Sequence, residues 1–228
     1  MLLAFLLESR RTLGASSENW VVRLNKVSHH FGTRKVFSPL EITLRSGETG
    51  VITGVNGSGK STLFRIIAGL LQPANGSVEI LRGGKSLDAT ARRSFIGYVS
   101  PDLTLYRELT GAENLRFFSE LQGRELRKSE LAELLNEVGL KGRGRDLVGS
   151  YSSGMRQRLK YAFALLNAPP ILLLDEPTAN LDVSGREMVE RILARQREHP
   201  EGGVTLIATN EPRELDWGDI LVRLERAE

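Results

Sequence analysis

The nine residues from Gly54 to Thr62, GVNGSGKST, constrain this chain more than any other stretch. They lie between the apolar run Gly50–Thr53, which predicts a strand, and the run Leu63–Ile67, which predicts a helix beginning near Lys60. A strand, a glycine-rich loop and a helix N-terminus direct backbone N–H groups and the positive end of the helix dipole at one point. The sequence therefore predicts a binding site for a polyphosphate.

The match to the pattern G-x-x-x-x-G-K-[ST] is complete and has the strand-loop-helix context that the pattern requires. Glycines let the backbone wrap closely around phosphate oxygens, Lys60 is expected to reach the β- and γ-phosphates, and the Ser61 hydroxyl is expected to ligate Mg²⁺. The predicted nucleotide-binding residues of the loop are Gly54, Val55, Asn56, Gly57, Ser58, Gly59, Lys60, Ser61 and Thr62.

Length and composition exclude several classes of protein. With 228 residues, one α/β domain with an inserted subdomain is expected rather than two separate domains. The chain has no cysteine, which excludes disulfides, thiolate metal sites and thiol catalysis. The net charge of +3 argues against a dedicated nucleic-acid binder. The apolar stretch 1–7 is too short to span a bilayer, so residues 1–19 are expected to form a tail and the protein to be cytoplasmic.

Alternation and turn residues predict most of the sheet. One strand is expected from Trp20 and ends at the segment 28–32, and Pro39 is expected to split the segment 36–44 into two strands. Phe31 is open to two interpretations from spacing alone, a ring that stacks on a nucleotide base or an edge-strand core aromatic. Further strands are expected at 76–81, 95–100, 203–209 and 220–224.

A block at about 101–155 differs from the rest because its periodicity is helical. Thr110 opens a capping box with Glu113, and the helix that follows is expected to bury Leu115, Phe118 and Leu121 on one stripe. A second helix is expected at about 129–138. A third begins after Ser152 or Ser153, either of which is a natural N-cap. That helix start is an ordinary cap or a second anion site.

The apolar run Ile171–Leu174 predicts a parallel strand buried on both faces, and it ends in Asp175 and Glu176. Open α/β proteins bind ligands at the carboxyl edge of such strands. Asp175 is therefore expected to serve Mg²⁺ and Glu176 to orient or deprotonate an attacking water. Ser184 is expected to cap a helix that runs to about Arg197.

In combination these motifs resemble the nucleotide-binding subunit of an ATP-binding-cassette (ABC) transporter over residues 20–224. Walker A corresponds to residues 54–62, a signature-like Tyr-Ser-Ser-Gly to residues 151–154, Walker B to residues 171–176 and a D-loop-like Asn-Leu-Asp to residues 180–182. The signature shortly before Walker B is what narrows a general phosphate loop to this family.

The resemblance implies a fold and a set of roles. The fold is an α/β P-loop NTPase of ABC type, with a mainly parallel core sheet, N-terminal antiparallel strands and an inserted helical subdomain that docks onto a membrane subunit. Phe31 falls at the aromatic that stacks on adenine. Ser152, Ser153 and Gly154 are expected to complete the ATP site of a second nucleotide-binding subunit, in a homodimer or a heterodimer.

Three positions depart from the family pattern. The usual Leu-Ser-Gly-Gly-Gln is replaced at residues 151–155, so a serine and a glycine remain for phosphate contact. Where a glutamine normally approaches Mg²⁺, this chain has Asp102, which replaces it as an oxygen ligand or leaves the contact absent. The expected switch histidine is Asn210, which donates a hydrogen bond but cannot take up a proton.

The resulting hypothesis is Mg²⁺-dependent ATP hydrolysis that powers a separate transmembrane permease from the cytoplasmic face of the membrane. Glu176 is the expected base, Lys60 the charge stabiliser and Asn210 the γ-phosphate contact. One alternative is a subunit that hydrolyses ATP weakly because of Asn210. Another is a soluble, non-transport ABC ATPase that serves cofactor assembly or acts on nucleic acid. A GTPase is disfavoured because the one Asn-Lys pair, Asn25-Lys26, precedes the loop and lacks a following Asp.

Overall fold

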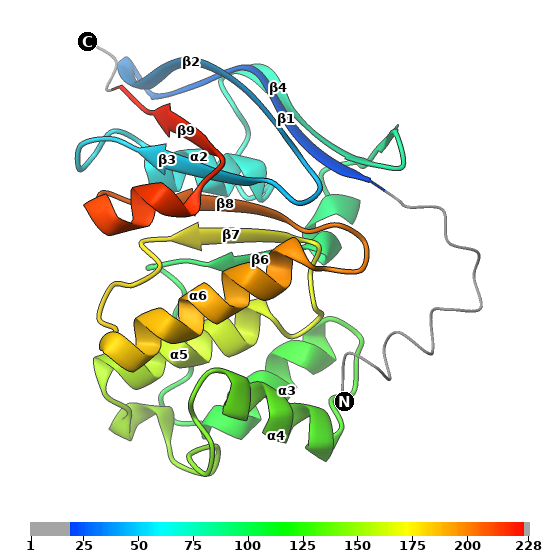
Figure 1. The fold of residues 1–228 in the computed structure, drawn as a ribbon, viewed down its shortest axis with the longest axis vertical. Helices are drawn as coiled ribbons and strands as arrows, with labels where there is room; N and C mark the ends of the chain where they lie inside the picture. The colour runs from blue at the N-terminus through cyan, green and yellow to red at the C-terminus, as the bar shows by residue number, and fades with distance from the viewer. Residues whose placement is uncertain (1–18, 226–228) are drawn as a thin grey trace. The chain divides into compact units, whose positions relative to one another are not determined.

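The computed structural model describes residues 19–225, so the predicted tail lies outside the described residues up to residue 18. The described residues divide into two compact units, a nucleotide unit (19–101, 169–177 and 193–225) and a helical unit (102–168 and 178–192). Figure 1 draws the strands and helices of each unit. Within the described range, no helix has the length and apolar character needed to cross a bilayer.

The nucleotide unit holds two sheets. The strands of the antiparallel sheet lie in the order β2-β1-β4-β5, and those of the parallel sheet in the order β6-β7-β8-β3-β9. Figure 1 labels each of these strands except β5. The strands are β1 (Trp20–Phe31), β2 (Arg34–Arg45), β3 (Thr49–Thr53), β4 (Asn75–Arg82), β5 (Lys85–Ser86), β6 (Ile96–Val99), β7 (Ile171–Asp175), β8 (Val204–Ala208) and β9 (Ile220–Arg223).

The predicted mixture of a parallel core sheet and N-terminal antiparallel strands is confirmed. β7 is buried at all five positions because it lies inside the sheet between β6 and β8. Helix α2 (Lys60–Ile67) packs on this sheet against β7 and β8 and buries Leu63, Phe64, Ile66 and Ile67. The loop before α2 is thus supported by a continuous apolar core.

One sequence expectation about the antiparallel sheet is wrong. β1 ends at Phe31, within the expected segment 28–32, but the expected strand pair around Pro39 is a single strand, β2. β2 is the edge strand, so the missing N–H of Pro39 interrupts no ladder on its outer side. Shifts in the β1–β2 register absorb the remaining irregularity.

The helical unit contains α3 (Gly111–Leu121), α4 (Lys128–Glu137), α5 (Ser153–Ala164) and the first ten residues of α6 (Val183–Arg197). Short 3₁₀ turns occur at η1 (Ala91–Phe95), η2 (Val148–Ser150) and η3 (Pro212–Trp217). The predicted capping box is present, because Thr110 accepts a hydrogen bond from the Glu113 N–H and its own N–H donates to the Glu113 carboxylate.

Two details of the helices differ from expectation. Leu115 is fully buried, but the Leu121 side chain is 69% exposed, at the last residue of α3. Asp182 rather than Ser184 caps α6, since its carboxylate accepts from the Gly185 N–H at 2.8 Å. A carboxylate is the stronger acceptor for an unpaired helical N–H.

Candidate functional site

The glycine-rich loop leaves β3 and enters α2, and its glycines are required by close contacts. A Cβ on Gly54 would lie 2.4 Å from the Leu224 carbonyl oxygen, and one on Gly59 would lie 2.5 Å from Val36 Cγ1. Gly59 is also the N-cap of α2 in a left-handed conformation, with φ at 101°. The chain at these points cannot accept a side chain without moving its neighbours.

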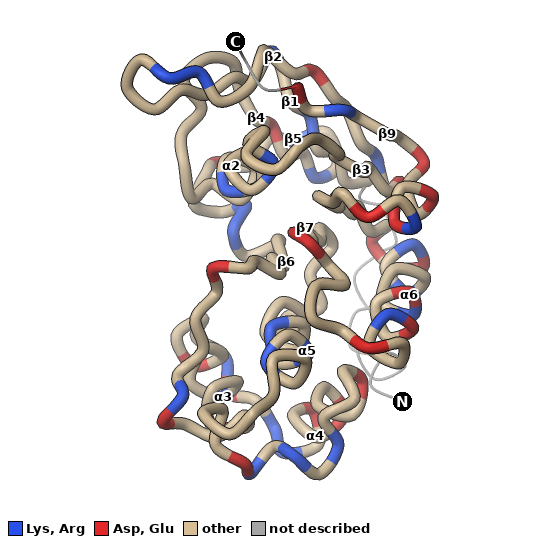
Figure 2. Tube along the Cα trace, turned by 90° about the vertical axis from the view of Figure 1, so that its left-hand side faces the viewer, with Lys and Arg blue, Asp and Glu red and all other residues tan. Residues whose placement is uncertain are grey.

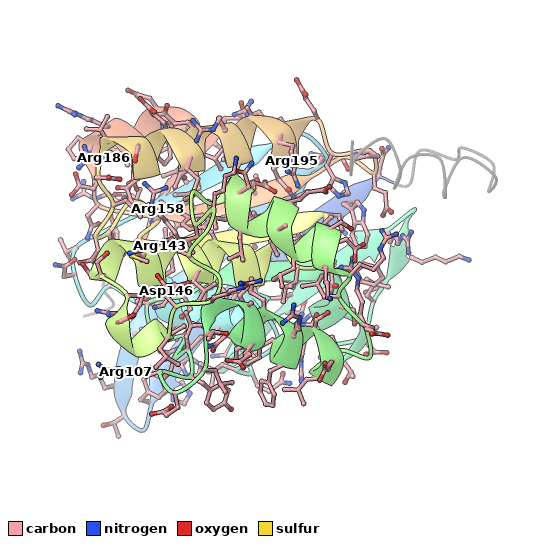
Figure 3. The ribbon with its side chains drawn as sticks, turned by 90° about the horizontal axis from the view of Figure 1, so that it is seen from below. Arg107, Arg143, Asp146, Arg158, Arg186 and Arg195 are labelled. Carbon is pink, nitrogen blue, oxygen red and sulfur yellow. The ribbon has the colours of Figure 1, made fainter. Side chains whose placement is uncertain are left out.

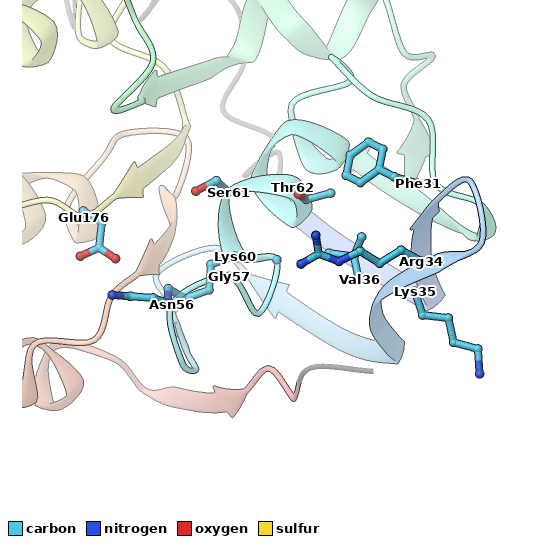
Figure 4. A pocket seen from close by; sticks show the side chains of 11 residues that line it. Phe31, Arg34, Lys35, Val36, Asn56, Gly57, Lys60, Ser61, Thr62 and Glu176 are labelled. Atoms are coloured by element: carbon cyan, nitrogen blue, oxygen red, sulfur yellow. The ribbon is translucent and has the colours of Figure 1, made fainter. Parts of the chain in front are cut away.

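A pocket of about 410 Å³ opens along this loop (Figure 4). Six of the predicted loop residues line it, and Glu176 lies across from them in Figure 4. Gly54, Val55 and Ser58 do not line it, and they shape the loop instead: Ser58 is fully buried, and its N–H donates to the Val55 carbonyl at 3.0 Å. The residues of the pocket are Phe31, Arg34, Lys35, Val36, Asn56, Gly57, Gly59, Lys60, Ser61, Thr62 and Glu176.

Lys60 is 6% exposed, and its ammonium group donates to the Gly54 carbonyl at 2.7 Å and to Asn210 Oδ1 at 3.1 Å. Asn210 in turn donates through Nδ2 to Asn56 Oδ1 at 2.7 Å. Asn210 follows β8, which pairs with β3, and this pairing brings it to the loop. The structure therefore places Asn210 beside the lysine that the sequence assigned to the β- and γ-phosphates.

The two acidic residues after the apolar run lie at the carboxyl end of β7, where Figure 2 shows a red segment. Asp175 is 1% exposed and accepts a hydrogen bond from the Tyr98 hydroxyl at 3.4 Å. Burial and the charge of Asp175 raise the pKa of Tyr98, so this hydroxyl stays protonated and remains a donor. Tyr98 is not among the site residues predicted from the sequence. The parallel pairing of β6 with β7 sets Tyr98 beside Leu173, two residues before Asp175 on the same strand.

Glu176 has a left-handed backbone, with φ at 51°, and its N–H donates to the Ala208 carbonyl at 2.9 Å. Non-glycine residues in this conformation are uncommon and gather at functional sites. Burial raises the pKa of the Glu176 carboxyl, the Lys60 ammonium lowers it, and the carboxylates of Asp175, Glu214 and Glu211 raise it further. A raised pKa favours a carboxylate that accepts a proton.

Phe31 lies at the other end of the pocket and is 54% exposed. Its ring meets that of His29 edge-on, with centroids 4.7 Å apart. This geometry disfavours the edge-strand core interpretation, because a core aromatic would be buried. Two cationic residues that the sequence analysis does not name, Arg34 and Lys35, also line the pocket. The feature of the sequence that could have indicated them is their position just after the turn that follows Phe31.

The signature-like segment lies in the helical unit, at the start of α5. Ser152 is the N-cap, and its hydroxyl accepts from the Met155 N–H at 3.1 Å. Ser152 and Ser153 are exposed, and a Cβ on Gly154 would lie 3.1 Å from the Asn180 carbonyl. Arg158 of α5 donates to Asp182 and Ser184 at the start of α6, and Figure 3 labels it together with Arg186 of α6.

The tyrosine of this segment has a structural role. Tyr151 is 3% exposed, and its hydroxyl donates to the Arg143 carbonyl at 2.7 Å. Arg143 also pairs with Asp146 at 3.2 Å, and both are labelled in Figure 3. Gly111 makes room for the tyrosine, because a Cβ there would lie 2.4 Å from its hydroxyl oxygen. The larger residue at the usual leucine position is thus matched by a glycine on α3.

Comparison with known proteins identifies the family that carries this set of motifs. The family model described as ABC transporter matches residues 37–179. The chain belongs to the ABC transporter family. It is an ABC-type ATPase and an ATP-binding subunit of that family.

Among curated relatives, the uncharacterized ABC transporter ATP-binding protein YdbJ of Bacillus subtilis is 33% identical over 91% of this chain and 67% of its own length. The Nod factor export ATP-binding protein I of Sinorhizobium fredii is 38% identical over 78% of this chain, which spans only 52% of that relative. The cytochrome c biogenesis ATP-binding export protein CcmA of Xanthomonas axonopodis is 38% identical over 77% of this chain and 79% of its own length.

The solved ABC cassette MJ0796 has the same fold. Its dimeric post-hydrolysis structure with ADP and Pi superposes with a TM-score of 0.77 at 28% identity, covering 90% of this chain and 94% of that one. The ABC assignment therefore rests on sequence and on structure together.

Asp102 is the one predicted metal residue outside the nucleotide unit. It is exposed in the helical unit, and its charge raises the pKa of Lys160, while burial of that lysine lowers it more strongly. That Asp102 ligates Mg²⁺ in this ABC cassette remains a prediction.

Proposed function

We propose that this ABC cassette binds and hydrolyses Mg²⁺–ATP to drive an exporter whose membrane-spanning permease is a separate chain. The observation that carries the proposal is that Lys60, Ser61 and Glu176 line one pocket with Phe31 at its far end. Such a pocket suits a nucleoside triphosphate, with the base at Phe31 and the phosphates along the loop.

The proposed chemistry is positioning and charge stabilisation by this chain's own groups. The loop N–H groups and Lys60 hold the phosphates, Asn210 donates to the γ-phosphate, and Glu176 orients the attacking water and accepts its proton. The raised pKa of Glu176 supports the last role, since the carboxyl binds a proton more readily than an ordinary glutamate.

The residues present fit a magnesium ion. Ser61 offers a hydroxyl and Asp175 a nearly buried carboxylate, and both are the hard oxygen ligands that Mg²⁺ prefers. Among residues 19–225 no group of three or more His, Asp or Glu side chains gathers to hold a metal. That is compatible with Mg²⁺, which takes one or two protein ligands and completes its shell with phosphate oxygens and water. The ion, when bound, neutralises charge on the β- and γ-phosphates.

We further propose a dimer of cassettes in which Ser152, Ser153 and Gly154 of one chain contact the nucleotide of the other. Support comes from the dimeric MJ0796 structure and from the exposed start of α5. A helix N-terminus with hydroxyl groups suits a γ-phosphate. The dimer is homomeric or is formed with a second nucleotide-binding subunit.

The proposed permease contact is an aromatic patch on the helical unit, formed by Tyr106, Phe117 and Phe118. The rings of Tyr106 and Phe117 lie 5.2 Å apart, and Tyr106 and Phe117 are 47% and 36% exposed. Leu121, four residues after Phe117 on the same helix, is 69% exposed. Contiguous exposed apolar side chains mark interaction surfaces. The placement is then peripheral, on the cytoplasmic face of the membrane, and an exporter is favoured because several relatives are named as export proteins.

The deciding experiment is affinity purification of the tagged chain from detergent-solubilised cells. We expect a polytopic membrane protein to copurify in amounts close to equimolar, and to be lost in Phe117→Ser while the ATPase activity of the purified chain remains. Capture with a soluble complex alone would overturn the exporter and support a non-transport ABC ATPase.

A second candidate is an ABC subunit in which nucleotide binding matters more than turnover, and the contact between Asn210 and Lys60 favours it. An asparagine holds this position without ever carrying positive charge. Asn210→His is expected to raise kcat for ATP without a matching change in affinity. Unchanged kcat in that variant would show that Asn210 does not limit the site.

A further inference from the structure

The nucleotide pocket carries a cation that neither the phosphate loop nor the acidic strand explains. Arg34 begins β2, directly after the turn formed by Gly32 and Thr33, and it lines the pocket. Its side chain makes no hydrogen bond or ion pair with any residue in the described range 19–225. A guanidinium beside an anion-binding loop, with no carboxylate of its own, is available to a bound anion.

Strand geometry fixes the side to which Arg34 points. It pairs directly with Phe31 across the hairpin, and directly opposed residues place their side chains on the same face. The β1–β2 hairpin also contacts the phosphate loop, because Val36 and Phe37 both lie close to Gly59. The register between β1 and β2 shifts at this point, between His29 and His30. Such an irregularity lets two consecutive side chains face the same side.

The neighbouring lysine faces the other way. Lys35 also lines the pocket, but strand alternation puts Arg34 on the same side as Val36 and directs the Lys35 side chain to the other face of the strand. Figure 4 agrees: the Arg34 guanidinium lies near Val36 below the Phe31 ring and Thr62, whereas the Lys35 ammonium is directed away from the pocket. Two adjacent cations therefore differ in direction although they share one hairpin.

We infer that the Arg34 guanidinium binds the α-phosphate of the nucleotide and so sets affinity for ATP and ADP alike. This inference rests on the proposed function. Phe31 marks the base end of the pocket, and Lys60 with Ser61 marks the end of the β- and γ-phosphates. The anionic group nearest to the base is the α-phosphate, and Arg34 lies on the base side as the strand partner of Phe31.

The consequence is a contact that is equal before and after hydrolysis. Because ATP and ADP both keep the α-phosphate, Arg34 is expected to stabilise substrate, transition state and product equally. Uniform stabilisation of this kind changes affinity and leaves kcat unaltered. Arg34 would thus be a nucleotide-affinity residue and not a catalytic one.

The test compares Arg34→Gln with Lys35→Gln in the full chain, because both remove one positive charge from the same hairpin. Dissociation constants for ATP and ADP are measured with Mg²⁺ by calorimetry, together with kcat at saturating ATP. Arg34→Gln is expected to weaken ATP and ADP about 10-fold each, which corresponds to ~1.4 kcal/mol, with kcat unchanged. Lys35→Gln is expected to change both constants by no more than about twofold, as a screened surface charge does.

Several results would overturn the inference. Equal losses of affinity in the two variants would indicate only a general positive field around the hairpin. A loss of affinity for ATP but not for ADP would place the contact on the γ-phosphate. An altered preference for ATP over GTP would place the contact on the base. If the wild-type chain bound neither nucleotide, the proposed function itself would fall. Tight wild-type binding that Arg34→Gln leaves intact would remove only the role of Arg34.

Discussion

The N-termini of α2 and α5 are both expected to meet phosphate, yet they are built differently. Gly59 caps α2 and offers no side chain to the helical N–H groups, whereas Ser152 caps α5 and already accepts from one of them. The start of α2 lies in a pocket with a nearly buried lysine, whereas the serines at the start of α5 are exposed. The start of α2 therefore has no cap side chain and is proposed to bind an external anion, whereas one N–H at the start of α5 is already bonded to its own cap.

A third helix shows what both termini lack. α3 carries Glu113 in its first turn, where the carboxylate closes the capping box with Thr110. Neither α2 nor α5 has an acidic residue in its first turn. An acidic side chain at a helix N-terminus occupies the place of a bound anion. The two candidate phosphate contacts therefore differ in this respect from α3, which carries its own carboxylate in the first turn.

The largest effect is expected from Lys60→Met, which removes the positive charge from the α2 terminus. A loss of one preorganised charge contact costs about 10²–10³ in turnover, and here ATP affinity should fall as well because the proposed contact between the lysine and the phosphates is removed. Calorimetric titration and a phosphate-release assay measure both. A variant that kept near-wild-type affinity and rate would show that the loop amides suffice without the lysine.

Glu176→Gln is expected to separate binding from chemistry at the same pocket. It keeps the shape of the side chain but cannot accept a proton, so kcat should fall by about 10²–10⁴ while ATP binding is retained and an ATP-bound dimer accumulates. Size exclusion with ATP and a turnover assay test this. Equal turnover in mutant and wild type would remove Glu176 from the role of base.

The pH dependence of turnover sharpens the assignment. The base must be ionised, and burial raises the pKa of Glu176 above its ordinary value of 4.5. The rate should therefore fall as the pH is lowered through this raised pKa, at a higher pH than an unperturbed glutamate would give. In Glu176→Gln this acid limb should be absent from the residual rate.

The parts of the molecule that were predictable from sequence are those with local causes. A run of four apolar residues followed by Asp175 predicts β7, because a strand buried on both faces needs apolar side chains at successive positions. A glycine-rich loop before Lys60 predicts the start of α2, because the tight loop needs glycine backbone conformations. Pro39 misled the strand assignment, because its tolerance depends on whether the strand is at an edge. Edge position is a property of the whole sheet.

The same distinction applies to the site. The hydrogen bond between Asn210 and Asn56 joins residues 154 positions apart, and it exists because β8 pairs with β3. The direction of the Arg34 side chain likewise depends on its pairing with Phe31 and on the register shift further along β1 and β2. Neither arrangement has a local pattern, so the residues were visible in the sequence while their contacts were not.

The smallest effect, and the sharpest comparison between helix termini, is expected from Ser152→Ala matched with Thr110→Ala. Each change removes an N-cap hydroxyl in the helical unit that accepts a helical N–H, and each should lower the free energy of unfolding by about 1 kcal/mol. Because the two variants lose the same kind of cap, any other difference between them is attributed to the proposed phosphate contact of Ser152.

That property is ATP-induced dimerisation, measured by size exclusion in the Glu176→Gln background so that nucleotide is not consumed. If Ser152 contacts the partner's γ-phosphate, Ser152→Ala should weaken the dimer by about 10-fold through the lost charge-assisted hydrogen bond, and Thr110→Ala should leave it intact. Equal dimerisation in both variants would reduce Ser152 to a helix cap. The anion role would then rest on the α5 amides and Ser153, and the Ser152 hydroxyl would serve only as the acceptor for the Met155 N–H.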